Sequence, residues 1–337
     1  MSILSFSGSS RTFCRQFHMH PFKHILFSLI AAVVPWNSMV AQEIRITSRA
    51  DDAPLPYATV VNRNQGIITS ADVNGKTQLA AAVGDTLSIS YVGYRTAVLR
   101  FSGQKELLIR LTQEQRTLPE VMIHHCSRTQ EFNFSNFETE KSRKRKNRAN
   151  MLPGGVIWSK GPIHNSKIAV LVKPQKTYAT LKSFSFWIEK YFDAPESWVR
   201  TPVLISLYEV LDSSGLPGAA VSEAPIIYYP KEKGKQTVRI DSLHVSVPLK
   251  GIYVGLQYVM NEEYKWNLLT KRRGQDSVLR DTTIIMYGGV MVGTHTVSSA
   301  LAYYNGIEEK WSYLPPPSPG QPPMAVKCAA TIEYCEE

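Results

Sequence analysis

Aromatic side chains near turns in the second half of the chain are the residues best able to do chemistry. An apolar ring can stack on the face of a sugar while the polar end of tyrosine or tryptophan stays in water. This pattern predicts a ligand-binding surface, for a glycan or for another protein of the cell envelope. The alternative is that most of these rings fill the core. The candidate ligand-binding residues are Trp198, Trp266, Tyr303, Tyr304, Trp311 and Tyr313.

Catalytic and metal-binding patterns are weaker. A glycosidase needs two carboxylates across a cleft, and no pair among the acidic residues is distinguished by its spacing. We therefore predict no catalytic residues, and a glycoside or ester hydrolase is kept as an alternative. The acids considered are Glu189, Asp193, Glu196, Glu262 and Glu263.

No histidine stands at the spacing from a glutamate that zinc proteases use, and His124-His125-Cys126 lacks nearby partner ligands. Asp72-Val73-Asn74-Gly75 resembles the start of a calcium loop, but the later ligands of that loop are absent, so we read it as a turn. We expect neither a metal ion nor a cofactor.

The N-terminus has the order of regions that is typical of a secretory signal peptide. Lys23 precedes the apolar run 25–34, and small residues end the leader at Ala41. We expect residues 1–41 to be removed, with Met19 as an alternative start. A run of about ten residues is too short to cross a ~30 Å hydrocarbon core as a helix. The mature chain should therefore be exported without a transmembrane span, to the periplasm, the outer membrane or the cell surface.

Positive charge is concentrated in one run. The formal net charge of +10 falls to +7 without residues 1–41, because that segment holds three basic residues and no acids. A polar segment without periodicity follows at 125–153, which we read as an exposed linker. Its basic run is either solvated or in contact with an anionic envelope surface. That run comprises Lys141, Arg143, Lys144, Arg145, Lys146 and Arg148. The rest of the mature chain is close to neutral, so we expect no nucleic-acid partner.

Three cysteines remain after the leader, namely Cys126, Cys328 and Cys335. An odd number leaves at least one thiol outside any intramolecular disulfide. Cys328 and Cys335 fall in one expected strand, where about 3.3 Å per residue separates their Cα atoms by roughly 23 Å. That is far beyond the ~7 Å which a disulfide tolerates. Pairing of Cys126 with either one is left open.

The segment 42–124 alternates between apolar and polar residues, as half-buried strands do. Alternation is clearest in Ile44–Thr47 and Thr86–Tyr91, and turns such as Asn74-Gly75 separate the strands at short intervals. Many short strands without helical periodicity predict an all-β sandwich.

The same segment resembles the carboxypeptidase regulatory-like domain, a seven-stranded prealbumin-like sandwich that is not catalytic. The resemblance rests on Pro54–Val60, Asp72–Lys76, Gly84–Tyr94, Leu107–Leu111 and Leu118–Val121. One departure is Lys76–Leu79, where the family usually has an aromatic residue after the Asn-Gly turn.

The family also occurs ahead of the plug and barrel of TonB-dependent outer-membrane receptors. The residues after the linker are too few for such a barrel. The resemblance therefore implies, as a further alternative, an accessory partner of such a transporter.

The segment 154–337 returns to alternation and predicts a second, jelly-roll-like sandwich. The expected strands are Lys167–Val172, Thr180–Ile188, Val203–Val210, Pro225–Tyr229, Thr237–Ile240, Gly251–Tyr258, Thr283–Tyr287 and Val326–Tyr334. Together these features predict an exported, non-enzymatic envelope protein with a binding or scaffold role.

Overall fold

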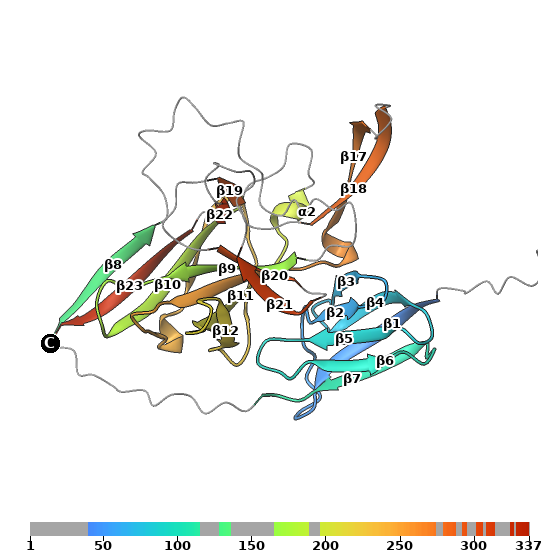
Figure 1. Cartoon of the computed structure of the whole chain (residues 1–337), viewed down its shortest axis with the longest axis horizontal. Coiled ribbons are helices and arrows are strands. Elements are labelled where there is room, and N and C mark those ends of the chain that lie inside the picture. The colour runs from blue at the N-terminus through green and yellow to red at the C-terminus, as the bar shows by residue number, and fades with distance from the viewer. Residues whose placement is uncertain are drawn as a thin grey trace, which may run out of the picture. The chain divides into compact units, whose positions relative to one another are not determined.

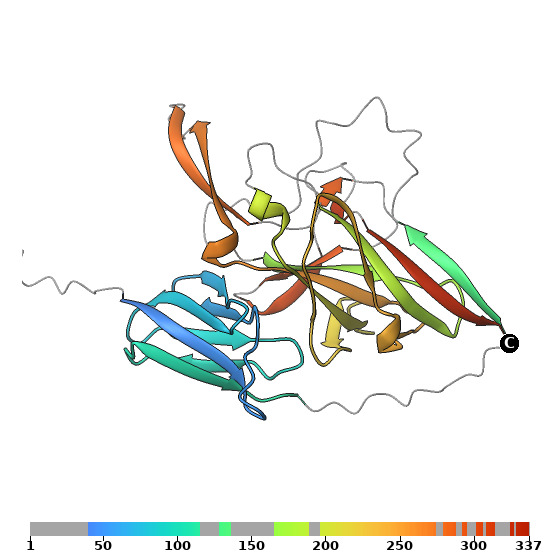
Figure 2. The same cartoon turned by 180° about the vertical axis from the view of Figure 1, so that it is seen from behind.

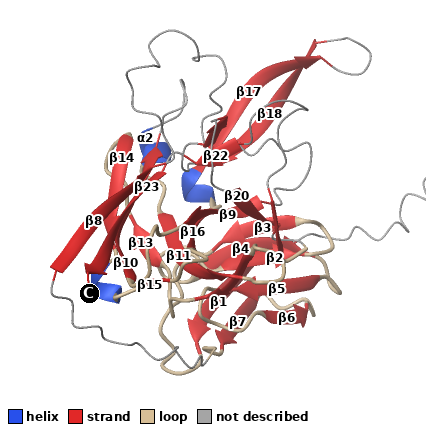
Figure 3. Ribbon diagram, turned by 60° about the vertical axis from the view of Figure 1, so that its left-hand side comes forward, coloured by secondary structure: helices blue, strands red, loops and turns tan. Residues whose placement is uncertain are grey.

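Strands account for nearly all of the regular structure of this protein (Figure 1). The computed structural model describes residues 40–114, 128–135, 165–188, 196–273, 279–287, 292–294, 301–305, 308–313, 324–326 and 328–336. The helical elements within them are the single turn α2 (Glu196–Val199) and two 3-10 turns, η2 (Asp241–Leu243) and η3 (Glu262–Tyr264). Figure 3 shows how few these are beside the strands. The predicted all-β fold class is confirmed.

Seven strands form the first sandwich, as predicted. One sheet has the order β4-β1-β7 and consists of β4 (Lys76–Ala81), β1 (Val40–Ser48) and β7 (Glu106–Leu111). The other has the order β3-β2-β5-β6 and consists of β3 (Ile67–Ser70), β2 (Thr59–Asn62), β5 (Thr86–Ser90) and β6 (Ala97–Arg100). β1 is antiparallel to β4 and parallel to β7, so the chain's first and last strands here lie side by side.

Alternation decides which residues these strands bury. Ile44 and Ile46 of β1 are fully buried, and so are Leu87 and Ile89 of β5. All four belong to one apolar cluster that fills the space between the two sheets. Burial of each such side chain contributes about 1.5–3 kcal/mol, so this core is what holds the two sheets face to face.

The turn at Asp72 has a structural role. Its Oδ1 accepts hydrogen bonds from the backbone N–H groups of Asn74 and Lys76, both at 2.8 Å. Gly75 has φ of +72°, and a Cβ there would lie 2.5 Å from the carbonyl oxygen of Ile46. Only glycine fits such a close approach at positive φ. The predicted turn is confirmed, and the Asp72 carboxylate stabilises it by accepting hydrogen bonds from the backbone of the turn.

Asp85 organises the neighbouring hairpins. Its Oδ2 accepts hydrogen bonds from Asn62 Nδ2 at 2.7 Å, Gln65 Nε2 at 2.8 Å and the Ala82 N–H at 2.9 Å. Burial raises the pKa of this carboxyl, but the hydrogen bonds outweigh burial and hold the pKa below its ordinary value. A buried carboxylate is stable here because several donors surround it.

Two larger sheets form the second sandwich (Figure 2). The larger sheet has the order β12-β11-β16-β9-β20-β21, and β13 pairs with β11 beside this row. Its strands are β12 (Pro217–Ala220), β11 (Val203–Val210), β16 (Ile252–Tyr258), β9 (Asn165–Val172), β20 (Leu301–Asn305), β21 (Lys310–Tyr313) and β13 (Ile226–Tyr228). The smaller has the order β14-β10-β23-β8, with β15 beside β10: β14 (Gly234–Arg239), β10 (Ala179–Ile188), β23 (Cys328–Glu336), β8 (Arg128–Ser135) and β15 (Ser246–Val247). Two separate pairs complete the inventory: β17 (Lys265–Arg273) with β18 (Leu279–Tyr287), and β19 (Val292–Thr294) with β22 (Met324–Val326).

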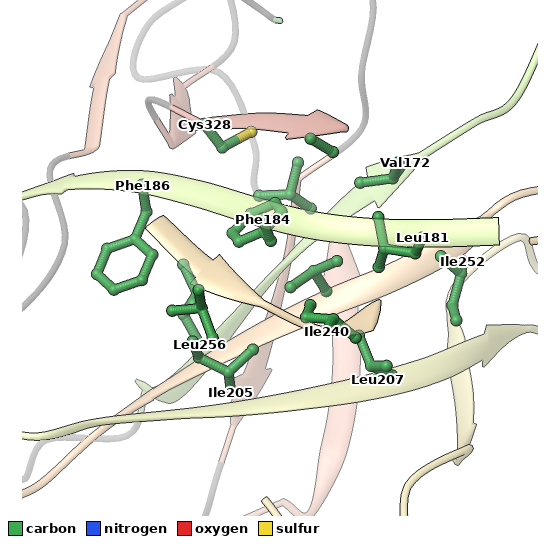
Figure 4. Close-up of a cluster of buried hydrophobic side chains, with 14 of the residues drawn as sticks. Val172, Leu181, Phe184, Phe186, Ile205, Leu207, Ile240, Ile252, Leu256 and Cys328 are labelled. Carbon is green, nitrogen blue, oxygen red and sulfur yellow. The ribbon is translucent and has the colours of Figure 1, made fainter. Parts of the chain in front are cut away.

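The core of the second sandwich lies between its two sheets (Figure 4). Phe184 and Phe186 of β10 are fully buried, and they belong to one apolar cluster with Leu207 of β11 and Leu256 of β16. Because side chains alternate along a strand, the residues between these positions lie on the outer faces of the sheets.

One prediction about domain organisation is wrong. Residues 128–135, which the sequence assigns to an exposed linker, form β8 and pair with β23 over its whole length. The segment does alternate, with Phe132 and Phe134 two residues apart, but polar residues fill its other positions and hide the pattern. An edge strand has one solvent-facing side and tolerates such residues.

The eight expected strands are present, most of them with shifted ends, whereas eight further strands of the described residues after position 125 were not predicted. These are β8, β12, β15, β17, β19, β20, β21 and β22. Most are short or edge strands, in which alternation is too brief to be recognised.

β1 begins at Val40, inside the predicted leader, and pairs Val40 with Ala81 and Ala41 with Ala80. Cleavage after Ala41 would leave the strand from Gln42 onward. The rest of the predicted leader and the basic run 141–148 lie outside the described residues. In the part of the chain that is described, no helix is long and apolar enough to cross a membrane.

Cys328 and Cys335 both lie in β23, as predicted, so they cannot bridge one another. Cys328 is fully buried in the core of the second sandwich, and burial raises the pKa of its thiol. Cys126 lies outside the described residues.

Residues 39–337 form one compact unit in which a seam joins the two sandwiches. We use the name seam for Tyr57, Thr59 and Ser70 of the first sandwich and Leu204, Gln257, Val259 and Met260 of the second. Gln257 Nε2 donates to Thr59 Oγ1 at 3.0 Å, and both residues are buried. The Ser70 N–H donates to the Met260 carbonyl at 2.9 Å, and the Met260 N–H donates to Ser70 Oγ at 3.0 Å.

Tyr57 is the apolar anchor of the seam. Its side chain packs with Leu204 and Val259, and only 2% of the residue is exposed. Its φ is +61°, a left-handed conformation that is strained for a bulky side chain. Such strain persists only where surrounding contacts outweigh it, so Tyr57 is held in place by what it buries.

Tyr57→Ala should lower the free energy of unfolding by about 3 kcal/mol, because a buried ring is lost while the strained φ remains. The matched control is Tyr229→Ala, which removes the other partner of the same hydroxyl contact (3.2 Å) from a residue that is 51% exposed. It should cost less than about 1 kcal/mol. Urea unfolding of the mature chain measures both, and equal losses would show that the seam does not depend on Tyr57.

The thiol of Cys328 should not react with a thiol reagent in the folded protein, since it is buried and its pKa is raised. In the mature chain, a Cys126→Ser/Cys335→Ser variant leaves this thiol as the one target. We expect labelling only when denaturant unfolds the chain. Fast labelling under native conditions would mean that the core at β23 opens readily.

Candidate functional site

Three neighbouring strands, β9, β20 and β21, bring the predicted aromatic residues together on one outer face. In register, Tyr304 of β20 lies opposite Lys167 of β9 on one side and opposite Trp311 of β21 on the other. Tyr313 lies one pleat further along β21, opposite Ala302. We call Lys167, Tyr208, Tyr304, Trp311 and Tyr313 the aromatic face.

The rings of this face contact one another edge to face. Trp311 lies 5.2 Å from Tyr304 and 5.3 Å from Tyr208 between ring centroids, at interplanar angles of 62° and 70°. Such pairs are worth about 0.5–1.5 kcal/mol beyond the area that they bury. The indole is therefore fixed in position although it is only partly buried.

Small residues make room for Tyr208. A Cβ at Gly255 would lie 2.5 Å from Cε2 of the Tyr208 ring. Ala169 and Ala302 pair across the next two strands and belong to the same apolar cluster as Tyr208. The small residues Gly255, Ala169 and Ala302 thus leave the space in which the Tyr208 ring reaches Trp311.

Two tyrosines hold the hairpin between β11 and β12 against the end of this face. The hydroxyl of Tyr253 donates to the Gly215 carbonyl at 2.8 Å, and that of Tyr313 donates to the Ser214 carbonyl at 2.9 Å. Tyr313 is 46% exposed. One tyrosine thus anchors the hairpin from within, and the other covers it from solvent.

Lys167 is the unusual charged residue of the face. Its ammonium lies 4.9 Å from the centroid of the Tyr304 ring, and no ion pair of Lys167 occurs among the described residues. Burial lowers its pKa to about 8. Among the described residues, the main stabilising contact of the Lys167 ammonium is therefore the quadrupole of the Tyr304 ring.

Tyr304 also borders the first sandwich. Burial raises the pKa of its hydroxyl to about 12, and the charge of Glu309 adds to the effect. Glu309 accepts a hydrogen bond from Ser88 and forms an ion pair with Arg63 at 2.7 Å. These contacts tie the turn before β21 to the first sandwich.

The predicted ligand-binding residues therefore separate into three groups. Tyr304, Trp311 and Tyr313 share the aromatic face, whereas Tyr303 lies on the other side of β20 and packs against the core. Trp198 and Trp266 belong to α2 and β17, and their side chains lie outside the described part of the chain.

Tyr303, Tyr304, Trp311 and Tyr313 stand in the short strands β20 and β21, which border a turn, and alternation sends Tyr303 and Tyr304 to opposite faces. Lys167 and Tyr208 were not predicted as binding residues because they lie within expected strands and away from turns. Alternation along Lys167–Val172 and Val203–Val210 could have placed both on outer faces.

No metal-binding cluster is found in the described residues. No three His, Cys, Asp or Glu side chains there gather where they could hold a metal ion. Of the acids considered from the sequence, Glu262 and Glu263 lie in η3 and Glu196 in α2, whereas Glu189 and Asp193 lie outside the described residues.

No protein-family model matches this chain, and the curated proteins contain no significant match to it. The functional reading therefore comes from the residues and their geometry.

Lys167→Met should stabilise the protein at pH 7 by about 1–2 kcal/mol, since it removes a partly buried charge. The pKa of Lys167 in the folded protein, about 8, lies below its ordinary value of 10.5. At a pH between these two values the unfolded chain therefore binds a proton that the folded chain has lost. The stability of the unsubstituted protein should therefore rise from pH 8 to about 10.5, relative to the variant. Urea unfolding at several pH values measures this. A difference that does not change with pH would contradict the assignment to Lys167.

Proposed function

We propose that this chain is an exported, non-enzymatic protein of the cell envelope that binds a glycan on the aromatic face of its second sandwich. The observation that carries the proposal is the arrangement of Trp311 and Tyr313 on β21, an edge strand of the larger sheet. Both rings are fixed by contacts on one side and reach solvent on the other.

Fixed rings suit sugar binding for an energetic reason. A ligand that meets ordered side chains avoids the entropy cost of ordering them, about 0.5–1.5 kcal/mol per side chain. The edge-to-face contacts of Trp311 and the hydroxyl bond of Tyr313 supply that order before a ligand arrives. A pyranose ring could then stack on the exposed part of either aromatic ring.

The first sandwich would act as a rigid support. Its resemblance to the carboxypeptidase regulatory-like domain, a non-catalytic scaffold, favours this role. The seam and the ion pair between Arg63 and Glu309 tie it to the second sandwich close to Tyr304. The predicted leader supports export to the envelope.

Binding to an array of neutral and acidic polysaccharides tests the proposal. Trp311→Ala and Tyr313→Ala should each weaken binding about tenfold, as expected for the loss of one stacked ring. Tyr313→Ala is the cleaner variant because Tyr313 is more exposed than Trp311. Tyr229→Ala removes a similarly exposed tyrosine elsewhere and should leave binding unchanged.

Two outcomes would reject the proposal. If the protein binds no glycan on the array, glycans are not its ligands. If all three variants bind equally well, the aromatic face is not the binding site. Release of reducing sugar or of an ester alcohol by the purified protein would replace binding with hydrolysis.

A further inference from the structure

A second surface that could meet a sugar lies on the smaller sheet of the second sandwich. Phe184, Phe186 and Ile188 of β10 enter the core, so Ser183, Ser185 and Trp187 lie on the opposite, outer side. We use the name Trp187 face for this side of the sheet. It comprises Ser183, Ser185 and Trp187 of β10, Lys235 and Thr237 of β14, and Thr331 of β23.

Hydroxyl groups and small side chains line the row of the Trp187 face next to the indole. Ser185 lies opposite Thr237 on one side and Ala329 on the other, and the Ser185 and Thr237 hydroxyls are 2.9 Å apart. Ser183 lies in the next row, opposite Thr331 on one side and Arg239 on the other. Ser185 is buried, whereas Thr237 is exposed, so a sugar ring beside Trp187 could meet the Thr237 hydroxyl, which donates and accepts.

Trp187 stands at the end of this face. It is partly exposed, and the core beneath it is filled by Phe184 and Phe186. The ammonium of Lys235, its direct cross-strand neighbour, lies 5.7 Å from the centroid of the indole ring. A stacking surface and a cation are thus side by side.

The charge next to Trp187 is positive. The turn that leads from β13 into β14 carries Lys231, Lys233 and Lys235, all exposed, with Glu232 as the acid among them. Among the described residues none of these lysines has an ion pair.

The other charged groups on this face are already balanced. Lys182 pairs with Glu333 at 3.1 Å, and Arg239 pairs with Asp241 at 2.5 Å. The uncompensated lysines therefore fit a ligand that carries negative charge.

We propose that the Trp187 face binds an acidic polysaccharide, with a sugar ring stacked on Trp187 and its carboxylate paired with Lys235. The inference rests on the proposed glycan-binding function but uses a different sheet and specifies the ligand class. Lys231 and Lys233 add attraction along the chain of sugars, and the exposed Thr237 hydroxyl meets its hydroxyl groups.

Polygalacturonate and its fully methyl-esterified form separate charge from shape, since the two polymers differ in the carboxylate alone. The mature protein should bind polygalacturonate at least about tenfold more tightly than the ester at low salt, and added salt should reduce the difference. Polyglutamate carries the charge without a sugar ring and should bind weakly. Isothermal calorimetry measures all three.

Variants assign the binding to residues. Trp187→Ala should weaken polygalacturonate binding about tenfold, Trp187→Tyr should retain part of it, and Lys235→Gln should weaken it about threefold to tenfold. Lys105→Gln removes one exposed charge from the first sandwich and is the matched control. Thermal unfolding confirms that each variant is folded.

Equal affinity for the acid and the ester, or unchanged binding by Trp187→Ala and Lys235→Gln, would overturn the inference. Polyglutamate bound as tightly as polygalacturonate would also overturn it, since charge alone would then suffice. If Trp311→Ala and Tyr313→Ala abolish neutral-glycan binding while polygalacturonate is ignored, the proposed function stands and the Trp187 face fails. If the unsubstituted protein binds neither a neutral glycan nor polygalacturonate, the proposed function and the inference for the Trp187 face are both rejected.

Discussion

The seam between the two sandwiches is the interaction on which the arrangement of this molecule depends. The seam has three parts. The backbones of Ser70 and Met260 are hydrogen-bonded, and the buried side chains of Thr59 and Gln257 share a hydrogen bond. The side chain of Tyr57 supplies the apolar contact. Polar groups buried in this way must be satisfied by each other, because water no longer reaches them. The seam therefore specifies one relative placement of the sandwiches, whereas apolar contact alone would permit many.

Small residues have as large an influence on the aromatic face as the rings themselves. Gly255 leaves the space into which the Tyr208 ring fits, and that ring in turn fixes Trp311. On the smaller sheet, Ser185 and Ala329 place no large side chain in the row next to Trp187. In both places, small residues determine how much space surrounds an aromatic ring.

The sequence predicts the core well and the surfaces poorly. Ile44, Ile46, Leu87 and Ile89 are buried as their alternation indicates, because a one-residue slip would turn every side chain to the wrong face. Edge strands such as β21 are too short to be recognised. Which aromatic residue faces solvent depends on register and on neighbouring strands, and thus Tyr303 and Tyr304, adjacent in sequence, have different surroundings.

β8 changes where the second sandwich begins. It covers the open side of β23 through eight register pairs, from Ser135 opposite Ala329 to Arg128 opposite Glu336. A fragment cut at residue 154 would expose the backbone donors and acceptors of β23 to any passing strand, and strands of two molecules could then pair edge to edge. In the intact chain β8 forms the edge of this sheet, and its charged residues Arg128 and Glu131 are of the kind that discourages such pairing.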